Sequence, residues 1–524
     1  MLTPSSYRFS SVCVLSLFLV ACGSGGGGNI APVLPTVPVT PTPAPDPTPA
    51  PDPTPDPAPT PAPDPTPDPA PAPNPVVGTP PEGSCDNNQV IYVASSDDSD
   101  TTNMAQDATN VIDHNLDTYW ESALSNVSLT LDLQEVYQVK DIRIAWYEGD
   151  TEQYTFSLAG SEDGVGFYDV VVDAQSDGVN TLPTPVDIEP TNLRYLQLST
   201  NFTSATNAKI SEIIVLGCAL DDSPVTAPDT FDIASLNLDP QASPGANFDL
   251  LTWGLDHPSD TDNNGRSDRI TETPLSNGFT SEFFFTADDG GMVLKSFLDG
   301  PKTSTNTSYV RTELREMLRR GDTSISTQGQ NLNNWVLGYQ PETAGAVGGR
   351  NGQLTTTMSV NNVSLTGENY QIGRVIIGQI HAESDEPIRL YYRKRPEHTT
   401  GYIYLAHEIN GGDDTIRMVY GPSYSNQNNQ PNFTSEPDIG FVLNEVFTYN
   451  IIQKGARIDV LIRNGGPNSP IIAHQYIDMD ELNSGYDVQD EWMYFKAGVY
   501  SGNNSGGSEE FNQATIYVLE NTHD

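Results

Sequence analysis

The sequence predicts an all-β protein in which two β-sandwich units follow an N-terminal segment without a core. Three observations support this fold class. Short apolar stretches, many alternating with polar residues, recur from residue 85 to the end, as in half-buried strands. The stretch 85–218 shows no convincing helical period. Residues 23–84 are instead rich in glycine and proline, a composition that cannot bury a core.

The first 22 residues have the composition of an export signal. Arg8 precedes the apolar run VCVLSLFLVAC, which ends at Cys22 and is too short to cross a membrane. The ending LVAC resembles a bacterial lipobox, which implies that Cys22 is lipidated; a plain signal peptide cleaved nearby is the alternative. By the same resemblance, Gly23 favours the outer membrane. We therefore expect an exported protein, lipid-anchored to the outer membrane or cell surface of a bacterium.

Residues 23–84 form a linker that contains the repeat PTPAPDPTPAPDPTPDPAP. Such a repeat adopts extended polyproline II at about 3.1 Å per residue, so roughly 45 residues reach about 140 Å. We expect a stalk; a peptide ligand for a partner domain is the alternative.

The four cysteines divide by position. Cys13 lies in the signal and Cys22 is the lipidation site, which leaves Cys85 and Cys218. Export places these two in an oxidising compartment, so we predict a disulfide between them. Two free thiols are the alternative.

The first unit spans residues 85–218, and its expected strands are VSLTLDLQ, VKDIRIAWYE, YTFSLAGS, LRYLQLST and SEIIVLGC. A second linker at 219–228 leads to the unit 229–524. Its expected strands include TSEFFFTAD, GQLTTTMSVNNVSLT, YQIGRVIIGQIHAES, IRLYYRKR, YIYLAHEI and ATIYVLEN. So many strands in one unit favour a β-sandwich or a jelly roll.

The formal net charge of −45 excludes nucleic acid as a partner, because phosphate binding needs a positive surface. However, 19 of the 24 Lys and Arg residues lie after residue 228, and a local positive region can attract an acidic partner whatever the net charge. The run IRLYYRKR, with Arg389, Arg393, Lys394 and Arg395, either extends such a region or forms an exposed edge.

The first unit contains the stretches NVIDHNLDTYWES, RIAWY, SEDGVGFYDV and KISEIIVLGC in this order. Together they resemble a discoidin-type (F5/8 type C) domain, a group that includes carbohydrate-binding module family 32. The resemblance implies a calcium ion held near Asp113, Thr118 and Glu212, and oxygen donors suit this hard cation. A polar turn without metal is the alternative.

Aromatic residues of this module are candidates for stacking on sugar: Tyr119, Trp146 and Tyr147. We expect Trp120, and at least one of these three, to lie in the core instead. Discoidin folds also bind proteins and lipids, so the resemblance supports carbohydrate targeting only in general terms.

In the second unit, three short stretches place ionisable groups at alternate positions of strand-like sequence. Alternation puts each group on one face of a strand, where burying it needs a compensating reason. The groups are Arg311, Glu313 and Arg315; Gln379 and His381; and Lys496 and Tyr500. The first stretch, SYVRTELREM, has the composition of a helix, but the all-β surroundings favour a strand.

Taken together, RTELR, QIH and YFKAGVY resemble the three signatures of alginate lyases of polysaccharide lyase family 7. The resemblance spans roughly residues 229–524 and implies a β-jelly roll with a long groove, which cleaves alginate by β-elimination. The third signature often continues with NQ, whereas Ser501, Gly502 and Asn503 follow here.

The resemblance also implies roles for these residues. Arg311 and Gln379 would neutralise the uronate carboxylate. His381 would be the base that removes the C5 proton, and Tyr500 the acid that protonates the leaving oxygen. Lys496 and Arg315 would bind neighbouring carboxylates, while Glu313 would hold the arginines in place. Catalysis would need no cofactor.

Each residue alone has a simpler interpretation: a structural histidine, a surface tyrosine or a solvated ladder of ion pairs. Only their combination favours catalysis. The alternatives for the whole protein are a lyase acting on another polyuronate such as glucuronan, or a non-catalytic glycan-binding surface lipoprotein. We expect a monomer. Ile380 resembles family members that favour guluronate-containing blocks, but the sequence leaves the uronate preference and the endo or exo mode open.

The run DTDNNGRSD, from Asp260 to Asp268, resembles the start of a calcium loop. Thr271 stands where such a loop has its bidentate acid. We therefore expect a polar surface turn.

Overall fold

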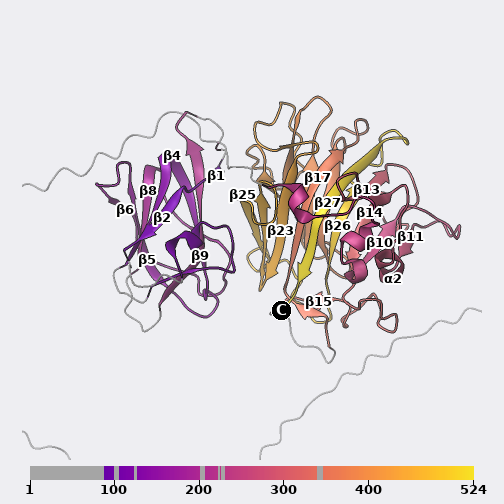
Figure 1. Ribbon diagram of the computed structural model, residues 1–524, viewed down its shortest axis with the longest axis horizontal. Helices are drawn as coiled ribbons and strands as arrows, with labels where there is room; N and C mark the ends of the chain where they lie inside the picture. Colours follow the sequence, from indigo (N-terminus) through magenta and orange to yellow (C-terminus); the bar gives the residue numbers. More distant parts are fainter. Residues whose placement is uncertain are drawn as a thin grey trace, which may run out of the picture. The chain divides into compact units, whose positions relative to one another are not determined.

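The computed structural model describes residues 88–99, 106–122, 127–200, 207–221, 225, 231–338 and 346–524 (Figure 1). The predicted signal, the lipidation at Cys22, the linker 23–84 and Cys85 fall outside these residues. The predicted Cys85–Cys218 disulfide therefore stays a prediction, although Cys218 itself is described and buried.

Strands dominate the described residues, which confirms the all-β prediction. The helical segments are single turns: η1 (Ala108–Val111), η2 (Ile233–Leu236), α1 (Pro244–Asn247), η3 (Leu250–Thr252) and α2 (Glu272–Ser276). Within the described part of the chain, no helix is long and apolar enough to cross a membrane.

The first sheet belongs to the N-terminal unit. Its strands are β1 (Gln89–Ile91), β2 (Ser95–Asp98), β3 (Trp120–Ser122), β4 (Ser128–Trp146), β5 (Thr155–Ser161), β6 (Tyr168–Gln175), β7 (Thr184–Val186), β8 (Thr191–Thr200) and β9 (Ala208–Ala219). The order is β1-β9-β4-β8-β5-β6, while β2 and β7 pair with β4, and β3 with β9. Alternation along β4 buries Leu129, Leu131 and Leu133 in one core with Trp120 and Trp146.

A second nine-stranded sheet, which we call the site sheet, follows in the C-terminal unit. Its strands are β10 (Trp253–His257), β11 (Asp268–Ile270), β14 (Arg311–Glu316), β18 (Arg374–His381), β19 (Ile388–Arg393), β20 (Thr400–Glu408), β21 (Asp414–Tyr420), β22 (Phe441–Val442) and β26 (Tyr494–Ser501). The order is β11-β10-β14-β26-β18-β19-β20-β21, and β22 pairs with β20.

A third sheet of seven strands completes the sandwich. Its strands are β12 (Phe284–Thr286), β13 (Met292–Phe297), β17 (Gly352–Asn362), β23 (Val446–Lys454), β24 (Arg457–Arg463), β25 (Ile471–Asp478) and β27 (Phe511–Thr522). The order is β12-β13-β27-β17-β23-β24-β25, and several of these strands lie side by side in Figure 1. A short pair, β15 (Trp335–Val336) and β16 (Gly349–Arg350), stands apart.

The two large sheets of the C-terminal unit share one apolar core. Leu314 and Val499 of the site sheet belong to the same buried cluster as Met358 and Ile451 of the third sheet. Because side chains alternate along a strand, the neighbours of Leu314 and Val499 point away from this core. The polar residues of the three motifs therefore share the opposite face of the site sheet.

The stretch SYVRTELREM contains a strand, as predicted, and not a helix. Arg311–Glu316 is hydrogen-bonded between β10 on one side and β26 on the other. Every residue of this segment pairs with at least one of these two strands, and this tertiary pairing outweighs the helix propensity of Glu, Leu and Arg.

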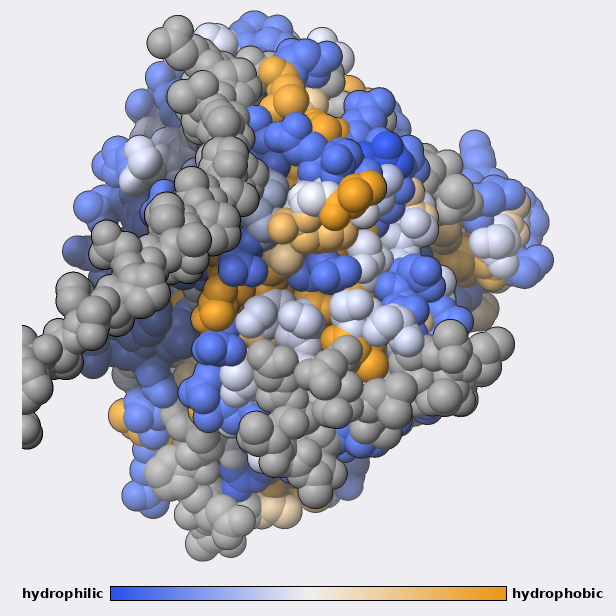
Figure 2. Space-filling view, turned by 90° about the vertical axis from the view of Figure 1, so that its left-hand side faces the viewer, coloured by the Kyte–Doolittle hydropathy of each residue, from blue (hydrophilic) through white to orange (hydrophobic). Residues whose placement is uncertain are grey.

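The surface mixes apolar and polar residues. Figure 2 shows apolar residues interspersed among hydrophilic ones on the face that it displays. The most exposed large apolar side chains of the described residues include Val165, Val172 and Val179 of the N-terminal unit. Single exposed side chains of this kind are ordinary on soluble domains.

Candidate active site

The three motifs come together because β14, β26 and β18 are adjacent strands of the site sheet. Arg311 lies opposite Tyr500, and Arg315 lies opposite Lys496. On the other side of β26, Lys496 lies opposite Gln379, and Tyr494 opposite His381. Segments far apart in the sequence thus place their polar side chains on one sheet face.

Glu313 is the centre of this cluster. Its carboxylate accepts a hydrogen bond from Arg311 Nη1 at 3.0 Å and lies 2.5 Å from Lys496 Nζ. The Gln379 amide nitrogen donates to the other oxygen. Glu313 is fully buried, and a buried carboxylate is stable only with such partners. It therefore fixes the orientation of three side chains from three strands.

Arg315 differs from the expectation that Glu313 would hold both arginines. Its guanidinium donates to Thr327 O at 2.6 Å and stacks over the Tyr494 ring, 3.9 Å from the centroid. Only 1% of its surface is exposed. Arg315 therefore packs against a face of the Tyr494 ring and holds it in position.

Asp256 and Arg269, which were not among the predicted site residues, extend the charged cluster. Asp256 is buried on β10, where Arg269 Nη2 lies 2.7 Å from one oxygen and Lys496 Nζ 3.4 Å from the other. Burial alone would raise the pKa of Asp256, but Arg269, Lys496 and Arg311 outweigh it and lower the pKa. Asp256 thus stays ionised and holds Lys496 from the side opposite Glu313.

His381 ends β18, and both of its ring nitrogens face oxygen atoms. Nδ1 lies 2.6 Å from the main-chain oxygen of Ala382, and Nε2 lies 3.3 Å from Glu386 Oε1. The ring stacks on Tyr494 at 4.9 Å between centroids. Burial lowers the pKa of His381 to about 4, against the opposing effect of Glu386. The imidazole is therefore neutral at neutral pH and able to accept a proton.

Arg311 and Tyr500 form a close pair. The Arg311 guanidinium carbon lies 3.6 Å from the centroid of the Tyr500 ring, within the range of a cation–π contact. Burial opposes the charge on Arg311, but Glu313 and Tyr500 raise its pKa. Arg311 thus stays cationic next to a phenol.

Access differs among these residues. The side chains of His381 and Arg311 expose 19% and 9% of their surface, whereas that of Glu313 exposes none. Tyr500 is 8% exposed and Gln379 is fully buried. Gln379 Oε1 accepts no hydrogen bond from the residues that the structure describes. His381 is therefore the most exposed of these groups, and Glu313 and Gln379 are enclosed.

The arginines of IRLYYRKR lie partly on this face, and each has hydrogen-bond or ion-pair partners there. Arg393 is fully buried and donates to the main-chain oxygens of Asn369 and Ile372. Arg389 pairs with Glu408 and Asp414, and Arg395 with Glu397. Between them, Tyr391 stacks on Tyr404 at 4.7 Å. This part of the face is aromatic more than it is positive.

In the N-terminal unit, the predicted calcium residues lie close together. Thr118 Oγ1 donates to Asp113 Oδ2 at 2.7 Å, and the His114 amide donates to Glu212 Oε2 at 3.0 Å. Burial, and then the Asp113 charge, raise the pKa of Glu212 well above its usual value. Two carboxyl groups forced together, one fully buried, are the donors that a hard cation would satisfy. The residues present therefore fit calcium.

Among the described residues, no group of three or more His, Cys, Asp or Glu side chains is placed to hold a metal. A calcium ion in the module would thus take its remaining ligands from Thr118 and main-chain oxygens. In the run DTDNNGRSD, the Asp260 carboxylate accepts from the amides of Asn264 and Gly265, which is the hydrogen bonding of a polar turn.

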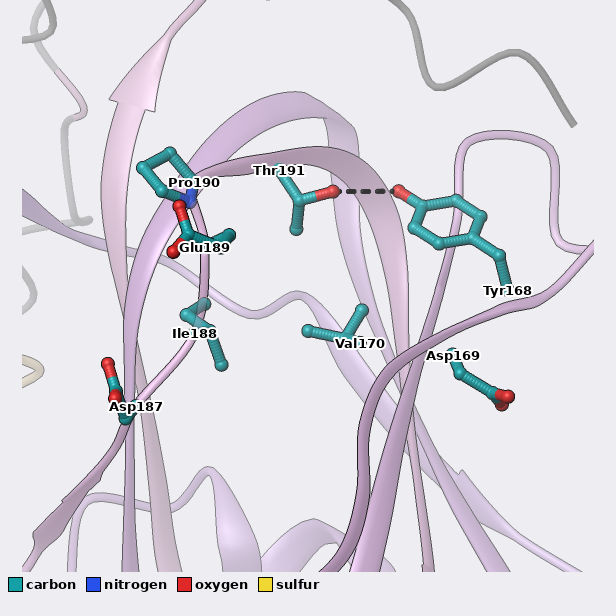
Figure 3. Close-up of a pocket in the computed structure, with 8 residues that line it drawn as sticks. All are labelled: Tyr168, Asp169, Val170, Asp187, Ile188, Glu189, Pro190 and Thr191. Atoms are coloured by element: carbon teal, nitrogen blue, oxygen red, sulfur yellow. Dashed lines mark hydrogen bonds between the residues drawn. The ribbon is translucent and has the colours of Figure 1, made fainter.

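The aromatic candidates of the module divide as expected. Trp120 and Trp146 are buried, whereas Tyr147 is 37% exposed and stacks on Tyr119 at 4.0 Å. A separate hollow lies beside β6, with Tyr168 hydrogen-bonded to Thr191 across it (Figure 3). Asp169, Asp187 and Glu189 line it, so it would repel an acidic polysaccharide.

Comparison with known proteins agrees with both resemblances. The family model "Alginate lyase" matches residues 248–523, and the model "F5/8 type C domain" matches residues 92–214. An alginate lyase of Klebsiella pneumoniae is 47% identical over 289 residues, which are 54% of this chain and 91% of that protein.

A crystal structure of the alginate lyase from Klebsiella pneumoniae aligns with a TM-score of 0.50 and 46% identity. It covers 54% of this chain and 99% of the other. Both resemblances stated from the sequence are thereby confirmed, and the chain belongs to the alginate lyase family.

Proposed function

We propose that the protein is an alginate lyase, which cleaves 4-O-linked uronates by β-elimination and releases unsaturated oligosaccharides. The observation that carries this proposal is the cluster around Glu313, which aligns Arg311 and Gln379 beside His381 and Tyr500 on one sheet face. These are the groups that the reaction requires: a carboxylate neutraliser, a base and an acid.

The chemical difficulty is the proton on C5, since the neighbouring carboxylate opposes the formation of a carbanion. Arg311 supplies the cation that stabilises this charge, and its Nε atom has no partner within the described residues. A preorganised donor of this kind gains strength in an enclosed site. Gln379 offers its second N–H to the same carboxylate.

His381 acts as the base through Nε2, because Nδ1 donates to the Ala382 oxygen. Tyr500 acts as the acid that protonates the glycosidic oxygen on C4. The electron pair of the C5–H bond forms the C4=C5 double bond as the C4–O bond breaks. The resemblance assigns Lys496 and Arg315 to neighbouring uronate carboxylates. Both are buried in this structure, where Lys496 pairs with Glu313 and Asp256 and Arg315 stacks on Tyr494.

The test is to incubate the purified protein with alginate and to follow the near-ultraviolet absorption of the unsaturated ends. His381→Ala and Tyr500→Phe each remove an acid–base group and should lower kcat by about 10²–10⁴-fold. Tyr195→Phe, in the N-terminal unit, makes the same chemical change away from the site and should leave kcat unchanged. Blocks of polyguluronate and polymannuronate, and glucuronan, compare the substrates; no signal on any polyuronate would contradict the proposal.

We propose in addition that residues 85–218 direct the enzyme to polysaccharide and hold a structural calcium ion at Asp113, Thr118 and Glu212. The module match and the buried Glu212 carboxylate support this.

The lipobox-like ending at Cys22 supports an outer-membrane anchor. Labelling cells with a fatty-acid analogue tests the anchor, since Cys22→Ala should abolish incorporation.

A further inference from the structure

Glu386 lies against the ring of His381, and nothing in the three sequence motifs pointed to it. Its Oε1 atom is 3.3 Å from His381 Nε2. The other ring nitrogen faces the Ala382 oxygen, and because a carbonyl only accepts, Nδ1 must carry a proton. The lone pair of the neutral ring is therefore on Nε2, the nitrogen that Glu386 contacts.

The main chain holds Glu386 in this place. The Glu408 amide on β20 donates to the main-chain oxygen of Glu386 at 3.3 Å, and the Ala382 amide donates to the main-chain oxygen of Asp385 at 2.8 Å. The Asp385 side chain in turn accepts from the Gly411 amide at 2.7 Å. The main chain of the short connection between β18 and β19 is thus held at several points beside His381.

Two neighbours keep the Glu386 carboxylate ionised. Arg389 Nη1 lies 3.6 Å from Oε2, and Arg389 also pairs with Glu408 and Asp414. Burial and a hydrogen bond with Glu386 raise the pKa of Glu408 to about 7. Burial would raise the pKa of Glu386, but His381 and Arg389 outweigh it and lower that pKa, so Glu386 keeps the negative charge.

The charged groups near His381 other than Glu386 disfavour protonation of its ring. Lys496 and Arg311 both disfavour the imidazolium, and burial disfavours it further. Tyr494 stacks on the ring face and contributes no charge of its own in this contact. Among the described groups that act on His381, Glu386 is the carboxylate that favours the imidazolium.

We propose that Glu386 is a positioning residue for the reaction: its carboxylate, which acts through His381, stabilises the positive charge that the ring acquires from the C5 proton. This inference rests on the proposed β-elimination with His381 as base. As the C5–H bond breaks, an Nε2–H bond forms and the ring becomes cationic. The electron pair of the C5–H bond enters the C4=C5 double bond, and the leaving oxygen takes the Tyr500 proton.

The substrate and Glu386 both face Nε2, so the Glu386 carboxylate must move away from this nitrogen when C5 of the substrate approaches it. Arg389, 3.6 Å from Oε2, keeps the carboxylate next to the ring, so its charge still acts on the imidazolium. The cationic His381 and the ionised Tyr500 left by each cleavage then neutralise each other by proton exchange through water. No other reactant is required.

The experiment compares Glu386→Gln, which keeps the size and removes the charge, with Glu386→Asp, which keeps the charge. Glu383→Gln is the matched control, because Glu383 is exposed in the same connection. Both kcat and kcat/KM on alginate are measured from pH 2.5 to 9, so that the acid limb near pH 4 and any shift to lower pH lie within the range. Thermal unfolding verifies that each variant is folded.

We expect Glu386→Gln to lower the plateau of kcat by about 10–100-fold, as for loss of a charged partner worth a few kcal/mol. KM should change less than about threefold. The acid limb of kcat/KM should move to lower pH, since the charge that raises the pKa of His381 is gone. Glu386→Asp should recover part of kcat, and Glu383→Gln should behave as the wild type.

A wild-type kcat in Glu386→Gln, or a lower kcat with an unmoved acid limb, would overturn the proposal. Failure of the proposed function looks different, because the wild type itself would then form no unsaturated product. Titration of isotope-labelled histidine by NMR gives a second readout that needs no turnover. The His381 resonance, assigned with His381→Asn, should titrate at lower pH in Glu386→Gln, and an unchanged titration would also overturn the proposal.

Discussion

At the residue scale, His381 presents one nitrogen to the substrate, because the Ala382 oxygen occupies the other. The pKa of this base is lowered to about 4 by burial. A base acts only when it is unprotonated, so it becomes active as the pH rises through its pKa. The same burial that makes the ring a weaker base keeps it available in mildly acidic surroundings.

We therefore predict that kcat/KM is level above about pH 5. Below about pH 4 it should fall about tenfold per pH unit, because a single protonation of His381 removes the base. The pH profile on alginate, with circular dichroism to show that the protein stays folded, checks this. An acid limb near the ordinary histidine value of about 6.5 would contradict the buried environment of the ring.

Glu313 makes a second prediction at this scale. Glu313→Gln removes the charge that Arg311 and Lys496 share, and breaking a buried pair from one side costs about 3–5 kcal/mol. Denaturant unfolding should show this loss, together with a large fall in kcat. Glu509→Gln makes the same change at an exposed position and should be neutral. Equal stability of the two variants would contradict a central role for Glu313.

At the element scale, β26 approaches β14 closely through Gly498. Its φ of 139° lies in a region that suits glycine,. A Cβ atom there would lie 2.8 Å from Leu294 Cδ2 and 2.9 Å from Thr312 O. The glycine therefore allows β14 and β26 to bring Arg311 and Tyr500 into contact.

We predict that Gly498→Ala destabilises the protein by at least about 2 kcal/mol, through backbone strain and a clash with β14. It should also lower kcat, because the strands separate at Arg311 and Tyr500. Gly455→Ala is the control, since its φ of 58° is positive but a Cβ meets nothing within 4 Å. If both variants lose the same stability, the close approach of the strands contributes nothing.

The sequence was sufficient to predict β14 as a strand and the alternation that gathers each motif on one face. It was insufficient for Asp256, Arg269 and Glu386. Each of these is a single charged residue whose partner belongs to another strand or connection, so its role depends on register and loop path. Only the polar aspartate in the apolar stretch WGLDH gave a local signal that could have been followed.

At the scale of the whole molecule, the chain has a net charge of −45 but gathers cationic side chains in the site sheet. Glu313 and Asp256 hold Arg311 and Lys496 in the site sheet, and three carboxylates line the hollow of the N-terminal unit. The electrostatic attraction of a polyuronate is therefore local to one sheet face.

We predict that removal of calcium destabilises the N-terminal unit. Chelation should lower its unfolding temperature, because the Asp113 and Glu212 carboxyl groups lose their counter-ion, and added calcium should restore it. Calorimetry with and without chelator measures this, with Glu212→Gln as the variant that no longer responds. Equal unfolding curves for the wild type under both conditions would contradict the calcium site. Activity on soluble alginate should not change.

The central claim is that the bond breaks by elimination and not by hydrolysis. Mass spectrometry of the oligosaccharides formed from alginate in oxygen-18-labelled water tests it most directly. Elimination takes no oxygen from water, so we predict unlabelled products with an unsaturated uronate at each new non-reducing end. One labelled oxygen per cleavage, with saturated ends, would contradict the account.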